Sequence, residues 1–135
     1  MSRSKSFLAL DVGEKRIGVA VGDSNIRIAV PLETVAVDGD ELSRIARIAV
    51  DENIDTIVVG YPRNQSGEAT AQTAYAEAFA KKVVDIAPKV VFQDESLTSV
   101  LAEQRLQLHK KAYTKADIDA QAAAIILQDY MEQVA

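Results

Sequence analysis

The sequence of 135 residues contains no cysteine and only one histidine, His109. The absence of cysteine excludes disulfide bonds, thiolate zinc sites and a thiol nucleophile. One histidine is too few for a histidine-rich metal site. Any metal site must therefore be built from oxygen ligands, which favour hard cations such as Mg²⁺ or Mn²⁺.

Long apolar runs are also missing. The first residues, MSRSKSFLAL, lead directly into Asp11 and do not form the apolar core of a signal peptide or a membrane span. We therefore expect a cytoplasmic protein with no membrane partner. The net charge of −5 means that the chain has no overall surplus of Lys and Arg for nonspecific nucleic-acid binding. A local basic patch remains compatible with this charge, because clustered catalytic acids would themselves make the total more negative.

Hydrophobic side chains make up 48% of the chain, which is enough for one compact domain spanning residues 1–135. Two β-rich runs at 6–12 and 16–21 flank a short turn that contains glycine, and this pattern predicts a β-hairpin. Residues 26–37 are predicted to form a third, irregular strand. Pro31 favours an edge position or a bulge for that strand.

The rest of the chain alternates helical stripes of apolar residues with short β-branched runs. The predicted elements are helices at 40–53, at 75–86, from 94–98 onward and at 118–131, strands at 54–60 and 90–92, and a surface loop at 61–68. The order, with strands and helices alternating after an opening meander, predicts an α/β fold around a mixed sheet.

Asp11 is the first candidate for a functional acid. Side chains alternate along a strand, so Asp11 lies on the same side as Phe7 and Ala9, at the end of a largely buried face. A buried carboxylate is costly unless it is paired, hydrogen-bonded, protonated or bound to a metal. The alternative is an aspartate that caps the turn at Gly13.

Asp94 and Glu95 follow the second predicted parallel strand, at the carboxyl edge where open α/β sheets place their sites. A structural alternative exists for both. Asp94 would cap the next helix, and Glu95 would lie in its first turn, where the helix dipole stabilises a negative charge.

Asp119 is the most informative acid. Thr114 and Asp117 have the spacing of a capping box, so Asp119 is not needed at the start of the last helix. At helical spacing it shares a stripe with Ala123 and Ile126 and points toward the core. A buried aspartate paired with an arginine is the alternative. However, three acidic residues placed at the same edge of the sheet could together supply the carboxylate ligands that a pair of divalent cations requires.

Five blocks of the sequence resemble the YqgF/RuvX family along almost the whole chain. They are DVGEKRIGVAVGD, AVPLET, IVVGYPRNQSGE, FQDESLTSVLAEQRL and DIDAQAAAIILQDY. The resemblance implies an RNase H-like fold, a mixed five-stranded sheet with helices on both faces. It places the acidic triad of the family on Asp11, Glu95 and Asp119, the same three acids. The chain differs from the family pattern DERLT at Ser96, where the family has an arginine that would contact the substrate near the scissile phosphate.

The resemblance also implies a metal-dependent endonuclease that processes the 5′ end of pre-16S rRNA in ribosome biogenesis. Two Mg²⁺ or Mn²⁺ ions held by the triad would activate a water and stabilise the leaving 3′-oxygen. Candidates for contacts to backbone phosphates are Lys15, Arg16, Arg63 and Asn64.

The expected partner is nucleic acid, with an RNA precursor, such as that of the small ribosomal subunit, ahead of a DNA junction. The chain is expected to be a monomer or a weak homodimer. Two alternatives stay open for its function: a Holliday junction resolvase that acts in DNA recombination and repair, and a noncatalytic nucleic-acid-binding module.

Overall fold

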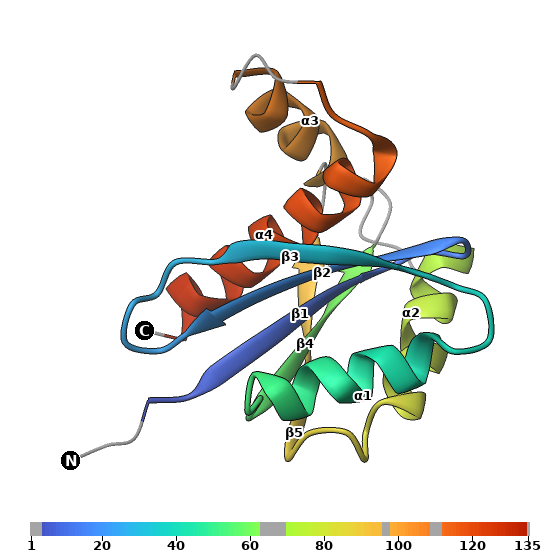
Figure 1. Ribbon diagram of the computed structural model, residues 1–135, viewed down its shortest axis with the longest axis vertical. Coiled ribbons are helices and arrows are strands. Elements are labelled where there is room, and N and C mark those ends of the chain that lie inside the picture. The colour runs from blue at the N-terminus through green and yellow to red at the C-terminus, as the bar shows by residue number, and fades with distance from the viewer. Residues whose placement is uncertain (1–3, 63–69, 96–97, 109–111, 135) are drawn as a thin grey trace.

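The computed structural model describes residues 4–62, 70–95, 98–108 and 112–134. Its elements are β1 (Ser6–Val12), β2 (Arg16–Asp23), β3 (Val30–Ala36), α1 (Glu41–Asp51), β4 (Thr56–Pro62), α2 (Ala71–Lys82), β5 (Lys89–Glu95), α3 (Thr98–Leu108) and α4 (Lys115–Gln133). The strands form one five-stranded sheet in the order β3-β2-β1-β4-β5 (Figure 1). β1 pairs antiparallel with β2 and parallel with β4, and β4 pairs parallel with β5. The predicted α/β fold with a mixed five-stranded sheet is confirmed.

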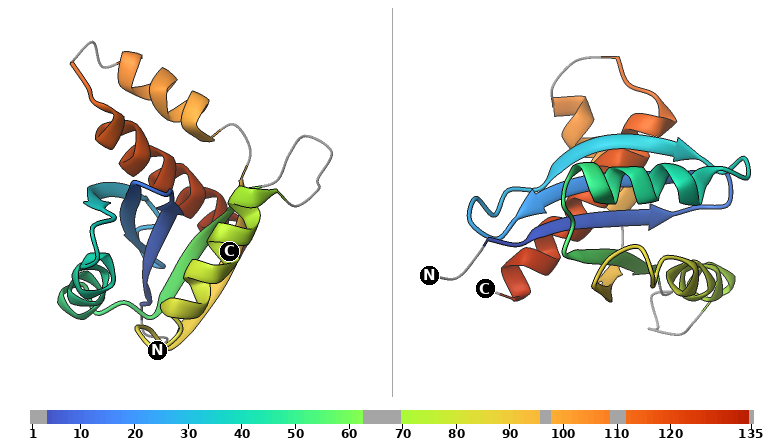
Figure 2. Two further views of the ribbon diagram at one scale, coloured as in Figure 1. Left: turned by 90° about the vertical axis from the view of Figure 1, so that its right-hand side faces the viewer. Right: turned by 60° about the horizontal axis from the view of Figure 1, so that its bottom comes forward.

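Helices cover both faces of this sheet, as predicted (Figure 2). The even-numbered residues Leu8 and Leu10 of β1 pack in the core cluster that includes residues of α1 and α2. The odd-numbered Phe7 and Ala9 pack in a second cluster with residues of α4. This division follows from the alternation of side chains along a strand. The central strand β1 is therefore buried on both sides.

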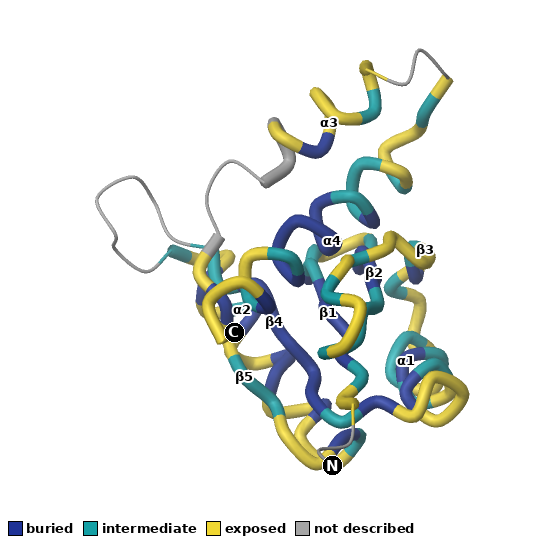
Figure 3. The backbone as a smooth tube through the Cα atoms, turned by 90° about the vertical axis from the view of Figure 1, so that its left-hand side faces the viewer, coloured by how far each residue is buried: buried dark blue, intermediate teal, exposed yellow. Residues whose placement is uncertain are grey.

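Helix α3 lies along α4, beyond the edge of the sheet (Figure 2). Among the side chains of α3 whose burial the structure describes, Ala102 is buried and packs with Ala122 and Ile125 of α4, and most of the others are exposed (Figure 3). α3 and the first turns of α4 thus project from the body of the protein. In the parts of the chain that the structure describes, no helix combines the length and the apolar character needed to cross a membrane.

Small residues on β2 let α4 approach the sheet closely. A Cβ atom added to Gly18 would lie 1.9 Å from the carbonyl oxygen of Asp119, so the helix backbone lies directly on this glycine. At Gly22 an added Cβ would instead lie 3.1 Å from the terminal methyl of Met131. A glycine inside a strand often marks such an approach of another backbone. The contact at Gly18 therefore determines how close Asp119 lies to the sheet.

The start of α4 has the predicted capping box. The Thr114 hydroxyl accepts a hydrogen bond from the backbone N–H of Asp117 at 3.3 Å, and the Asp117 carboxylate accepts one from the N–H of Thr114 at 2.8 Å. These bonds satisfy two backbone donors at the helix start. Asp119 therefore has no capping role, although α4 begins three residues earlier than the predicted 118.

The third strand is shorter than predicted, because it begins at Val30 and not at Ile26. Asp23 closes a turn instead, since its Oδ1 accepts hydrogen bonds from the backbone N–H groups of Asn25 and Ile26 at 2.9 Å and 2.7 Å. An aspartate that bonds to the backbone two and three residues ahead competes with strand pairing. β3 is an edge strand, as Pro31 predicted, and its register with β2 shifts at Val19 and Ala20.

β5 is longer than predicted, whereas β4 has the predicted length but begins and ends two residues later. β4 continues through Tyr61 and Pro62, and these residues pair with Asp94 and Glu95 of β5. The alternative in which Asp94 caps a helix and Glu95 lies in its first turn is therefore wrong. The helix α3 starts only at Thr98. The remainder of the loop predicted at 61–68 lies outside the described residues.

Candidate functional site

Asp11 and Asp119 meet between the end of β1 and α4. Asp11 is the penultimate residue of β1, on the face where Phe7 and Ala9 pack with α4. Its partner across the hairpin is Gly18, and the backbone of Asp119 lies on that glycine. Two acids that are far apart in the sequence are therefore neighbours, as predicted.

The two acids oppose each other electrostatically. Burial raises the pKa of the Asp11 carboxyl, and the negative charge of Asp119 raises it further, from 3.8 to about 7. Burial disfavours the charged form because protein replaces water around the carboxylate, and a like charge nearby adds repulsion. A proton or a cation bound at this position would relieve both effects.

Arg16 supplies one positive charge at the site. It is the first residue of β2, and its Nε donates a hydrogen bond to Oδ2 of Asp119 at 2.7 Å. The side chains of Arg16 and Asp119 are 39% and 22% exposed, so the ion pair lies at the rim of the site and not in the core. The arginine partner considered for Asp119 is therefore present. Arg16, predicted to contact phosphate, binds this carboxylate in the structure.

Glu95 lies at the same edge of the sheet by its backbone position. It is the last residue of β5, which runs parallel to β1 through β4, so both strands end on the same side. Its side chain lies outside what the structure describes. Among the described side chains, no group of three or more His, Asp or Glu residues is placed to hold one metal ion. The triad of Asp11, Glu95 and Asp119 thus remains a prediction, of which the structure brings two members together.

The other predicted contacts belong to the first hairpin and to the sequence that follows β4. Lys15 is exposed in the turn before Arg16, and its backbone carbonyl accepts a hydrogen bond from the N–H of Val37 at 3.0 Å. Arg63 and Asn64 lie outside the described residues, and so does Ser96. Of the two described candidates, Arg16 is paired with Asp119, whereas Lys15 is exposed and follows Asp11 by four residues in the sequence.

Two further residues of the sheet, one of them in contact with Asp119, were not selected from the sequence. Gly18 is one, and its signal was available, because a glycine inside a strand suggests close approach of another chain segment. Gln93 is the other: it is only 6% exposed, and its amide donates to the backbone carbonyl of Asp94 at 3.5 Å. No local pattern distinguishes a buried glutamine from an exposed one, so sequence reasoning could not have found it.

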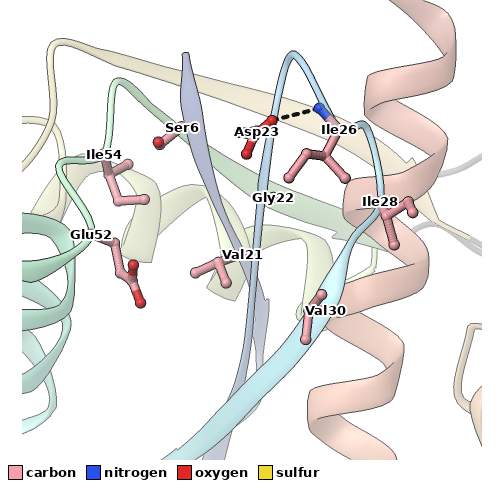
Figure 4. Close-up of a pocket in the computed structure, with 9 residues that line it drawn as sticks. All are labelled: Ser6, Val21, Gly22, Asp23, Ile26, Ile28, Val30, Glu52 and Ile54. Carbon is pink, nitrogen blue, oxygen red and sulfur yellow. Dashed lines mark hydrogen bonds between the residues drawn. The ribbon is translucent and has the colours of Figure 1, made fainter. Parts of the chain in front are cut away.

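A cavity of about 400 Å³ lies at the opposite end of β1 (Figure 4). Its wall includes Ser6, the first residue of β1, and the aliphatic side chains of Val21, Ile26 and Ile54. Asp11 is at the other end of the strand, so this cavity and the acidic pair are separate features of the fold.

Solved structures of junction-resolving nucleases share this fold. The chain superposes on Thermus thermophilus RuvC in complex with a Holliday junction substrate with a TM-score of 0.58 and 16% identity, covering 96% of this chain and 95% of that chain. Fowlpox virus resolvase, solved with Holliday junction DNA, also gives a TM-score of 0.58, with 13% identity and coverage of 96% and 98%. At these identities the likeness concerns the fold alone, and it confirms the predicted RNase H-like fold.

Sequence comparison adds the family. A Chloroflexus aurantiacus protein named "Putative pre-16S rRNA nuclease" is 43% identical over 131 residues, which is 93% of this chain and 86% of that protein. A Synechocystis protein of the same name is 36% identical over 137 residues, with 98% and 90% covered. The family model described as "RuvX: Holliday junction resolvase" matches residues 5–133. The chain, nearly all of which is matched, therefore belongs to the YqgF/RuvX family.

Proposed function

We propose that this protein is a metal-dependent endonuclease that hydrolyses nucleic-acid phosphodiesters, with a 16S rRNA precursor as its substrate. The observation that carries the proposal is the meeting of Asp11 and Asp119 at the end of β1, beside the carboxyl edge of the sheet. Open α/β sheets bind their ligands at this edge. The names of relatives from Chloroflexus aurantiacus and Synechocystis support pre-16S rRNA as the substrate.

The donor set fits Mg²⁺ or Mn²⁺. These hard cations prefer carboxylate oxygens, and Asp11 is a carboxyl whose ionised form is opposed by burial and by Asp119. We assign Glu95, at the end of β5, as the third ligand. When bound, the metal supplies an activated water and stabilises the charge that develops on the phosphate and the leaving oxygen.

The residues of the chain would position the nucleic acid. Lys15 is exposed in the connection from β1 to β2, four residues after Asp11, and we assign its ammonium to a backbone phosphate. We assign the same role to Arg63 and Asn64, which follow β4 in the sequence. Phosphate contacts orient a substrate without reading its sequence, so these residues would not by themselves choose between RNA and DNA.

A second candidate function is the resolution of Holliday junctions. The description of the family model favours it. The carboxylate chemistry acts on a phosphate that both nucleic acids share, so the acids are compatible with either substrate. A junction resolvase must place two active sites by symmetry and therefore requires a homodimer, whereas a nuclease that trims an RNA precursor can act as a monomer.

Cleavage assays on three labelled substrates separate these functions. They are a pre-16S rRNA fragment with its 5′ leader, a four-way DNA junction and a DNA duplex, each with Mn²⁺ and with EDTA. Mn²⁺-dependent cleavage of the RNA alone supports the proposal, and cleavage of the junction alone supports the second candidate. Binding without cleavage of any substrate would instead indicate a noncatalytic module and would contradict both.

The same assays test Asp119. Asp119→Asn removes one negative oxygen ligand, so Mn²⁺-dependent cleavage should fall by orders of magnitude, and the rise in melting temperature on adding Mn²⁺ should shrink. Asp117→Asn is a matched control on the same helix, because Asp117 serves the capping box and not the acidic pair. Undiminished metal stabilisation of Asp119→Asn would show that Asp119 is only a structural partner of Arg16.

A further inference from the structure

Arg16 is fixed beside the acidic site by the strand that carries it. Arg16 is the first residue of β2 and pairs with Ala36 of β3. Two residues later, the backbone of Asp119 packs directly against Gly18. Both ends of the ion pair are therefore anchored by tight main-chain contacts. The Nε of Arg16 is directed at Oδ2 of Asp119 at 2.7 Å, the length of a charge-assisted hydrogen bond.

The ion pair between Arg16 and Asp119 has the features of a contact in which another cation can replace the arginine. The Arg16 side chain is 39% exposed, and partly exposed ion pairs contribute little to folding. Within the described residues, the Nε bond to Asp119 is the single ion pair of Arg16. By contrast, Arg27 donates to the backbone carbonyl of Met131 and holds the end of α4, which is a structural role.

The pair also engages the carboxylate that a metal ion would use. Oδ2 of Asp119 accepts the arginine hydrogen bond, and a divalent cation bound at either oxygen of this carboxylate would lie close to the guanidinium. A guanidinium kept next to a divalent cation would be repelled by it. Metal and arginine therefore compete for the same carboxylate.

We propose that Arg16 is a built-in counter-cation of the acidic site, which binds Asp119 in the metal-free protein and is displaced when a divalent metal ion binds. The inference rests on the proposed function, because it requires Asp11 and Asp119 to bind metal. It explains how two close acids are tolerated in the metal-free chain. Once displaced, the guanidinium lies at the rim of the site, where the phosphate of a nucleic acid can accept its hydrogen bonds.

Metal affinity of an arginine variant tests the competition without any cleavage assay. The affinity for Mn²⁺ is measured by calorimetry on the full chain after EDTA treatment, with no nucleic acid present. Arg16→Gln should bind Mn²⁺ about two- to fivefold more tightly than the wild type, the factor expected from removing a partly exposed ion pair. The control is Arg44→Gln, because the Arg44 side chain is about as exposed as that of Arg16 and pairs with Asp38, away from the acidic site. The Mn²⁺ affinity of this variant should not change.

Thermal melting of the same variants distinguishes a counter-cation from a structural arginine. Arg16→Gln should melt below the wild type in EDTA, and the deficit should disappear at saturating Mn²⁺, where the wild-type pair is already broken. A structural arginine would lower the melting temperature equally in both conditions and would leave the Mn²⁺ affinity unchanged, which would overturn the proposal.

The wild-type protein provides a direct readout should Arg16→Gln fail to fold. The Nε–H of Arg16 should exchange slowly with solvent in EDTA and faster in saturating Mg²⁺, as measured by NMR. Unchanged exchange overturns the displacement. If the wild type binds Mg²⁺ or Mn²⁺ and Arg16 stays in place, the proposed function stands and only this inference fails. If the wild type binds neither ion, both fail together.

Discussion

Replacement of Asp11 by asparagine is expected to stabilise the metal-free protein at neutral and alkaline pH. The pKa of Asp11 is about 7 in the folded chain, against 3.8 for an ordinary aspartate. Between these values the unfolded chain has released a proton that the folded chain still holds. The free energy of unfolding therefore falls as the pH rises through this window and stays at its lower value above it. Asparagine has no charge to bury, so the free energy of unfolding of Asp11→Asn does not fall in this pH window.

The size of the effect follows from the pKa. A rise from 3.8 to about 7 corresponds to an upper limit of about 4 kcal/mol. Asp11 is only half-buried, so solvent screens part of the repulsion, and we expect about 2 kcal/mol. For a chain of this length, that difference raises the melting temperature by about 6 °C.

Urea unfolding in EDTA at about pH 4 and about pH 8 measures this contribution. The wild type and Asp11→Asn should be equally stable at the lower pH, where Asp11 is protonated in the folded chain, and should diverge at the higher pH. Asp85→Asn, an exposed carboxylate between α2 and β5, is the control and should follow the wild type throughout. Addition of Mn²⁺ should stabilise the wild type and not Asp11→Asn. An Asp11→Asn variant less stable than the wild type at pH 8 would refute the argument, because the folded chain would then favour the charged form of Asp11.

Three further changes test the elements that build the site. Gly18→Ala should cost about 3 kcal/mol and weaken Mn²⁺ binding, because the new methyl would lie 1.9 Å from the carbonyl oxygen of Asp119 and displace that backbone. Gly22→Ala should cost less, because its nearest contacts, the Met131 methyl at 3.1 Å and the Ile28 carbonyl oxygen at 3.2 Å, are less severe; equal losses of stability for the two would contradict the close approach at Gly18. Thr114→Ala should destabilise the protein by about 1 kcal/mol in urea unfolding through loss of the cap of α4, and no change would mean that this cap is dispensable. Arg63→Ala should weaken nucleic-acid binding more than it slows single-turnover cleavage at saturating substrate; the opposite order would assign Arg63 to the chemical step.

Local patterns in the sequence determined which face each residue of β1 takes and how the last helix is capped. The period of two in β1 placed Asp11 with Phe7 and Ala9, and the structure has these residues on the α4 face. The spacing of Thr114 and Asp117 predicted the cap of the last helix. These features depend on neighbours a few residues away, so the sequence alone contains the information that specifies them.

The tertiary structure decided the features that depend on partners distant in the chain. Whether Glu95 belongs to a strand or to a helix was settled by pairing with Pro62 of β4, because a strand continues as long as a neighbour supplies hydrogen bonds. The ion pair between Arg16 and Asp119 depends on the packing of α4 on Gly18, which brings Asp119 to the hairpin. Composition and periodicity contain no information on which arginine reaches which aspartate. That choice depends on the register of the hairpin and the depth of the helix, both of which are set by packing across the whole sheet.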